Sequence, residues 1–190
     1  MREKQTWGKI RVTLKGLTPL LMNKLTPETL QTKSRRKLEQ PDFETQAEKS
    51  AYIAEIDGKK QLYIPNYTVY AMIINTAKQY RARRIPLSRL LAGTIRIEPE
   101  KIPLGTDKYE IDIRPVVIQR NRVLKARAKI PEWQITFTII YNKKFLPEGI
   151  PDTLKQILED AGVRTGLLDY RPQHMGWFGT FEVAEFKEET

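Results

Sequence analysis

The segment RPQHMGWFGTFEV, residues 171–183, contains the side chain best suited to acid–base catalysis. His174 is the only histidine of the chain, and imidazole is the side chain whose ordinary pKa lies closest to neutrality. It could serve as a general base toward a ribose 2′-hydroxyl if a neighbour such as Tyr170, Asp169 or Lys125 set its tautomer. A surface histidine without such a partner would be incidental.

The same segment also has the composition of a binding loop. Gly176 and Gly179 flank an aromatic pair, and glycine lets a backbone approach a ligand closely. Arg171 adds a positive charge and Trp177 adds a ring that could stack on a base. This interpretation predicts a protein that holds nucleic acid, whereas the histidine predicts one that cleaves it.

A cationic strand favours binding. In QRNRVLKARAKI, residues 119–130, Lys125, Arg127 and Lys129 alternate with small or apolar residues, so they share one face of a β-strand. Arg120 and Arg122 fall at the tip of the hairpin that this strand forms with the preceding one. Such a ribbon could follow a phosphate backbone. The alternative is an edge strand that its charges protect from aggregation.

Two further basic clusters argue against edge protection alone. The chain carries 33 Lys and Arg against 23 Asp and Glu, a net charge of +10, which suggests a polyanionic partner, nucleic acid being the commonest. Tyr67, Trp133 and Trp177 lie near basic segments and could stack on bases, although Trp133 is expected in the core. The two clusters are Lys33, Arg35, Arg36 and Lys37, and Arg81, Arg83 and Arg84.

The sequence offers little apparatus for catalysis. It has no cysteine, no phosphate-binding glycine-rich loop with a Lys-Ser/Thr pair, and no paired carboxylates at helical spacing. We therefore expect neither an enzyme nor a metal or other cofactor. No apolar run approaches the ~20 residues of a membrane span, and no signal peptide is apparent, so a cytoplasmic location is expected.

Hydrophobic periodicity predicts an α+β fold in one domain, residues 1–190. Two prolines begin the expected helices, and Gly162 is placed at the end of the second. Asn66 is the expected cap of the first helix, and Arg81, Arg83 and Arg84 are expected in its last turn, where positive charge is favourable. The expected strands are 6–16, a hairpin within 51–64 that turns at Asp57-Gly58, 93–98, 109–118, 122–130, 132–141 and 178–186; the helices are 65–84 and 151–162.

Without its insertions, this order is strand, helix, strand, strand, helix, strand. It matches the ferredoxin-like βαββαβ arrangement of RNA-recognition modules, an antiparallel sheet with both helices on one face. A long insertion with weak periodicity, residues 17–46, follows the first strand, and long structureless stretches are often functional.

Three stretches together resemble the RAMP superfamily of CRISPR proteins, especially the subunits that form the helical backbone on guide RNA. They are GLTPLLMNKL at 16–25, YIPNYTVYAMIINTAKQY at 63–80 and GLLDYRPQHMGWFGTFEV at 166–183. In layout the chain is most similar to small proteins of phages and archaeal mobile elements. The resemblance implies an RNA-recognition-like fold and a glycine-rich loop, Gly176 to Phe181, that contacts nucleic-acid backbone.

The resemblance also implies a protruding hairpin, or thumb, for which residues 113–130 are the candidate. RNA-cleaving members of the superfamily use a histidine near the start of the chain, so cleavage does not carry over to His174. The expected function is non-catalytic binding of single-stranded RNA or DNA, with assembly into a homo-oligomer or filament along the strand. The alternative is a metal-independent RNA endonuclease with His174 as base.

Overall fold

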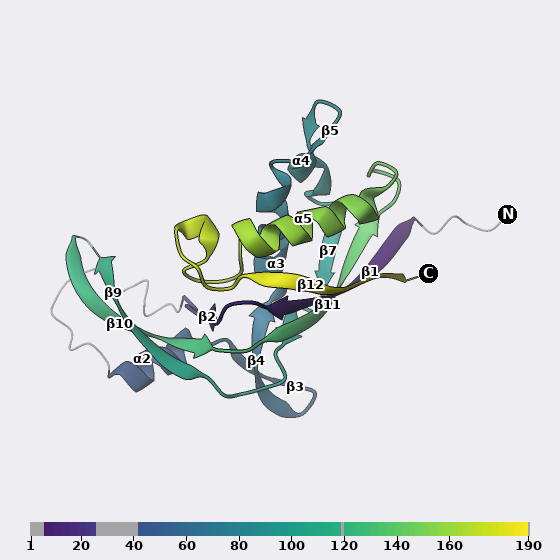
Figure 1. Ribbon diagram of the computed structural model, residues 1–190. Helices are drawn as coiled ribbons and strands as arrows, with labels where there is room; N and C mark the ends of the chain where they lie inside the picture. Colours follow the sequence, from purple (N-terminus) through teal and green to yellow (C-terminus); the bar gives the residue numbers. More distant parts are fainter. Residues whose placement is uncertain (1–5, 26–41, 119, 190) are drawn as a thin grey trace.

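The computed structural model describes residues 6–25, 42–118 and 120–189. The fold is of the predicted α+β class, with antiparallel sheets (Figure 1). Its largest sheet is built from β1 (Trp7–Gly16), β7 (Ile95–Glu98), β11 (Gln134–Asn142) and β12 (Phe181–Glu189), in the order β12-β1-β11-β7. Helices α3 (Asn66–Ala77) and α5 (Ile150–Arg164) connect these strands and lie together on one face of the sheet (Figure 1).

Alternation along β1 determines which face of this sheet is buried. Ile10, Val12 and Leu14 are fully buried and pair in register with Ile139, Phe137 and Ile135 of β11. Their neighbours on the other face, Lys9, Arg11 and Lys15, are exposed. Burying the apolar side of such a strand against two amphipathic helices is the main stabilising term of a fold of this kind.

Both large helices end differently from the prediction. Helix α3 stops at Ala77, because Tyr80 is held against α5 by a hydrogen bond from its hydroxyl to Asp160, 2.7 Å. The three arginines therefore do not sit in its last turn, and Asn66 is not the cap, since its amide donates to the carbonyl of Ile97. Burial, followed by the Asp160 contact, raises the pKa of Tyr80 to about 12.

Gly162 lies inside α5 rather than at its end. A Cβ at this position would lie 2.1 Å from the carbonyl oxygen of Phe181, so the glycine lets β12 pass close to the helix. The helix is stopped instead near Gly166, which has a positive φ of 70° and whose amide donates to the carbonyl of Ala161.

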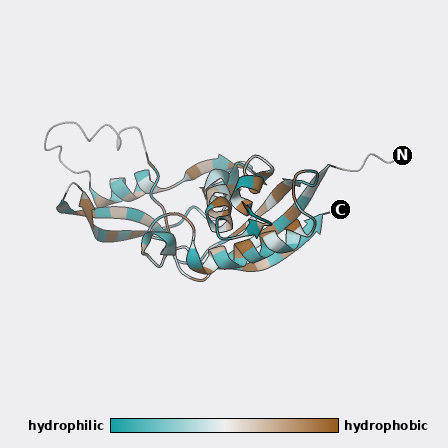
Figure 2. Cartoon of the chain, turned by 90° about the horizontal axis from the view of Figure 1, so that it is seen from above, coloured by the Kyte–Doolittle hydropathy of each residue, from teal (hydrophilic) through white to brown (hydrophobic). Residues whose placement is uncertain are grey.

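A long hairpin over the residues predicted at 113–130 is formed by β9 (Glu110–Ile118) and β10 (Asn121–Ile130). It extends from one end of the molecule (Figures 1 and 2), and β2 (Leu20–Leu21) pairs with its base. Helix α2 (Phe43–Ser50) covers the remaining edge of β10: the backbone amides of Ala126 and Ala128 donate to side chains of this helix, Gln46 and Ser50.

Two elements fall partly or wholly within the insertion expected at 17–46: β2 near its start and the first residues of α2 at its end. Asp42 caps α2 by accepting from the Thr45 amide, 2.7 Å, a local bond that weak periodicity did not reveal. Residues 26–41 of the insertion lie outside the described residues.

The remaining elements are short. The hairpin turn at Asp57-Gly58 is confirmed, with positive φ at both residues. No helix within the described residues is both long and apolar enough to cross a membrane. The short elements are β3 (Ile53–Ile56), β4 (Lys59–Pro65), β8 (Lys101–Pro103), β5 (Arg81–Ala82), β6 (Ile85–Pro86), α4 (Leu87–Leu91) and the 3-10 turn η1 (Pro172–His174).

Candidate nucleic-acid interface

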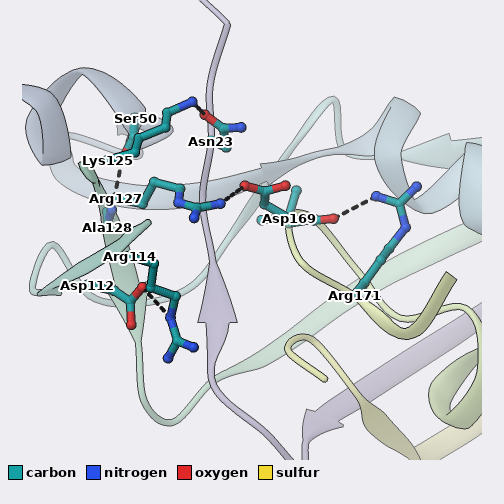
Figure 3. Close-up of polar contacts among 10 residues, drawn as sticks. Asn23, Ser50, Asp112, Arg114, Lys125, Arg127, Ala128, Asp169 and Arg171 are labelled. Atoms are coloured by element: carbon teal, nitrogen blue, oxygen red, sulfur yellow. Dashed lines mark hydrogen bonds and ion pairs between the residues drawn. The ribbon is translucent and has the colours of Figure 1, made fainter. Parts of the chain in front are cut away.

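Each of the three predicted cations on the cationic face of β10 has a partner, and Figure 3 shows the contacts that Lys125 and Arg127 make with residues outside the hairpin. Lys125 donates to the side chain of Asn23, 2.8 Å, and Lys129 pairs with Glu110 of β9, 2.7 Å. Arg127 forms an ion pair with Asp169, from the segment after α5. The sequence pattern correctly placed these residues on one face of a strand, but not the partners that folding brings to them.

Arg127 is the most deeply enclosed of these cations. It is 5% exposed, and its Nε is buried without a hydrogen-bond partner among the described residues. Burial lowers the pKa of Lys125, as does repulsion from Arg127, while Asp169 acts in the opposite direction. These contacts give Arg127 a structural role and leave it less accessible to phosphate than the alternating pattern suggested.

Arg114 is a contact residue that the sequence analysis missed. It follows Asp112 on the same face of β9 and bonds to that carboxylate, 2.7 Å. Its guanidinium lies 4.8 Å from the ring centre of Phe178 and 5.8 Å from that of Tyr170. It therefore joins the hairpin to the closing loop, residues 166–180. The Asp-x-Arg alternation in β9 was the available signal, but the aromatic partners are more than 50 residues away in the chain.

The two glycines of the closing loop are explained by contacts within the chain. A Cβ at Gly176 would lie 1.8 Å from the carbonyl oxygen of Tyr170, and one at Gly179 would lie 2.1 Å from that of Leu167. Gly179 also has a positive φ of 68°. The close backbone approach that glycine permits is thus made to the loop itself. Contact with a nucleic-acid backbone stays a prediction for both residues.

Trp177 presents a surface to solvent beside this junction. Its ring is 52% exposed and packs at 4.6 Å against Phe178, which is buried. Arg171 lies in the same loop. Its guanidinium already makes hydrogen bonds within the loop, because it donates to the carbonyl of Leu168, 2.6 Å, and to the side chain of Gln173. Trp133, by contrast, is buried in the core as expected, with its indole donating to the carbonyl of Thr18.

His174 lies at the end of η1 and is exposed. No hydrogen bond or ion pair joins its imidazole to another described residue. Asp169 is engaged with Arg127, and Lys125 with Asn23. The structure thus does not bring together the histidine and the partners that would fix its tautomer. Among the described residues, no three carboxylate or histidine side chains lie close enough to hold a metal ion.

The other predicted basic residues occupy separate places. Arg81, Arg83 and Arg84 are exposed on the small β5–β6 hairpin, far from the β9–β10 hairpin in Figure 1. Arg120 and Arg122 are exposed at the tip of the long hairpin, where Arg120 has a φ of 68°. The cluster Lys33, Arg35, Arg36 and Lys37 lies outside the described residues.

Comparisons with known proteins establish the fold. No family model matches the chain, and no curated protein matches it in sequence. Its structure is similar to a chain in the cryo-EM structure of the Type III-B Cmr-beta bound to cognate target RNA, with a TM-score of 0.61 and 12% identity. The match covers 96% of this chain and 61% of the other, so the present chain spans about three fifths of that protein. This likeness shows that the two chains share a fold.

Proposed function

We propose that this protein binds single-stranded nucleic acid, RNA above all, and does not cleave it. The observation that carries the proposal is that most Lys and Arg side chains of the described residues are exposed and form no ion pair. In the described part of the chain, only three ion pairs engage Lys or Arg, those of Arg114, Arg127 and Lys129. Most other cationic side chains there are exposed, and exposed cations gain from meeting phosphates because condensed counterions are released.

Fold similarity adds support, since the Cmr-beta chain belongs to a structure with target RNA. We further assign the main sheet to the ferredoxin-like arrangement. The chain order β1, α3, β7, β11, α5, β12 and the sheet order β12-β1-β11-β7 support this assignment, because both βαβ halves interleave in one antiparallel sheet.

The candidate contacts are the exposed cations and the exposed aromatic ring. Arg120 and Arg122 at the hairpin tip and the arginines of β5–β6 would contact phosphates, while Trp177 would stack on a base. Arg127 contributes mainly by holding the hairpin against the closing loop through Asp169, Lys125 by binding Asn23, and Lys129 by its ion pair with Glu110 within the hairpin.

Assembly along the strand is part of the proposal. The hairpin face opposite Arg127 carries exposed apolar side chains, Ile111, Ile113, Val117 and Leu124, which a neighbouring copy would cover. We expect cooperative binding and a protein-to-strand ratio that rises with strand length in sedimentation experiments. One protein per strand at every length would remove assembly from the proposal and leave binding intact.

Fluorescence anisotropy with single-stranded RNA, single-stranded DNA and duplex RNA, repeated across salt concentrations, tests binding. Single strands should bind tightest, and log K should fall steeply with log salt, by about 0.7 for each phosphate contact. Equal weakness toward all three would overturn the proposal. RNA incubated between about pH 6 and pH 9, the range over which a histidine titrates, should remain intact, whereas cleavage that disappears in His174→Ala would establish the nuclease alternative.

A further inference from the structure

A concave site of about 380 Å³ opens beside the hairpin, between the segment that follows β2, strands β4 and β8, and the start of α3. Tyr52, Tyr63 and Tyr67 line it together with Asn23, Lys24 and Lys101. Its size is within the range of about 300–1,000 Å³ typical of small-molecule sites. It has no part in the contacts described above, apart from Asn23, which links it to Lys125 of the hairpin.

The three tyrosines differ in how far their rings are held by neighbouring side chains and exposed to solvent. Tyr52 and Tyr63 are held edge to face, with ring centres 5.7 Å apart at an interplanar angle of 65°. The Lys101 ammonium lies 5.7 Å from the ring centre of Tyr63. Tyr67, in the first turn of α3, is 60% exposed. Its ring is therefore the one in the site that is most open to a planar ligand.

The polar groups of the site are suited to a ligand with hydrogen-bonding edges and an attached phosphate. Burial raises the pKa of Tyr52, as does a hydrogen bond with Tyr67, and burial also raises that of Tyr63, so both phenols stay protonated and able to donate near neutrality. Lys24 and Lys101 supply positive charge, and Glu100 is the one carboxylate in the lining.

We propose that this site receives one unstacked nucleobase of the bound strand, stacked on Tyr67, with the adjoining phosphate near Lys24 and Lys101. The inference rests on the proposed function. A base is flat, offers donors and acceptors along its edge, and stacks on aromatic side chains with about 1–3 kcal/mol of affinity. The link from Asn23 to Lys125 places the site next to the hairpin whose tip arginines are proposed to contact phosphates.

Tyr67→Ala is the decisive variant, because an exposed ring can be removed with little effect on folding. Phe145→Ala is its matched control: Phe145 is 62% exposed, close to the 60% of Tyr67, and lies outside the site. We expect Tyr67→Ala to weaken binding of single-stranded RNA about tenfold, or ~1.4 kcal/mol. Phe145→Ala and Tyr67→Trp should remain close to the parent protein.

An abasic strand of the same length separates stacking from backbone contact. The parent protein and Tyr67→Ala should bind it equally, since neither has a base to stack. Equal losses in Tyr67→Ala and Phe145→Ala on normal RNA, or an undiminished loss on the abasic strand, would overturn the base site while leaving strand binding established.

Failure of the proposed function would look different, because the parent protein would then bind no single strand at all. In that case saturation-transfer NMR with AMP and CMP still tests the site. Transfer to the base protons that vanishes in Tyr67→Ala would support recognition of a base in a free nucleotide. Absence of transfer would overturn the site.

Discussion

Two hairpins of this protein are both strongly basic in sequence, yet their cations are in opposite situations. On β9–β10, Lys125, Arg127 and Lys129 each have a partner contributed by another segment or strand. On β5–β6, three arginines are exposed, and among the described residues their side chains make one hydrogen bond, a long one within the hairpin from Arg81 to the carbonyl of Arg84, 3.4 Å.

The difference shows that a run of cations does not by itself reveal its role. The long hairpin rests on the closing loop, where an aspartate and two aromatic rings meet its polar face. Within the described ranges, none of the ion pairs involves the short hairpin. The paired cations on the face of the first hairpin therefore contribute to internal cohesion, whereas those on the second are exposed.

The largest effect is expected from removing Arg127. Arg127→Met would leave Asp169 without its ion-pair partner, and loss of one member of an enclosed pair costs about 3–5 kcal/mol. Because Asp169 is partly exposed, we expect a loss of about 2–3 kcal/mol in the free energy of unfolding, measured by urea denaturation.

Two further variants make this test specific. Arg122→Met, at the exposed tip, should change stability by no more than about 0.5 kcal/mol. Asp169→Asn added to Arg127→Met should recover much of the loss, since no carboxylate is then left unpaired. If the Arg127→Met protein were as stable as the parent, the ion pair with Asp169 would contribute nothing to stability.

Replacing each of the two sets of arginines and lysines by alanine tests their roles in binding. Alanine at Arg81, Arg83 and Arg84 should lower the slope of log K against log salt by about two, from about 0.7 for each lost phosphate contact, with unchanged melting temperature. Alanine at Lys125, Arg127 and Lys129 should instead lower the melting temperature. The slope should change by less than the value of one phosphate contact, about 0.7. A smaller slope from the 125, 127 and 129 substitutions, together with a lower melting temperature from those at 81, 83 and 84, would contradict the roles assigned to the two hairpins.

The smallest effect concerns Lys125 and pH. Its pKa is lowered by burial and by Arg127, so folding disfavours its charged form. Between the lowered pKa and the unfolded value near 10.5, the unfolded state binds more protons, and stability should rise with pH. Lys125→Met should lack this rise. Unfolding of both proteins between about pH 8 and pH 10.5 measures the difference, and parallel curves would contradict it.

Much of the fold could be predicted because its signals are local. The alternation in β1, β9, β10 and β11 and the Asp57-Gly58 turn all appear in the structure. Errors arose where a distant segment intervened. Tyr80 bonds to Asp160 and α3 ends early, and Gly162 is needed by β12 rather than by the end of α5.

In the candidate site, too, some features could be predicted from local sequence and others depend on distant segments. By itself, the sequence determined the net charge, the strand faces on which cations stand, and the glycines and aromatics of the closing loop, because these depend on residue type and on a period of two. Only the tertiary structure decided which cations are neutralised and what each glycine is close to. Asp169 reaches Arg127 across 42 positions, and Tyr170 and Phe178 meet Arg114 from a different element. Such meetings depend on how elements pack, and no local pattern encodes them.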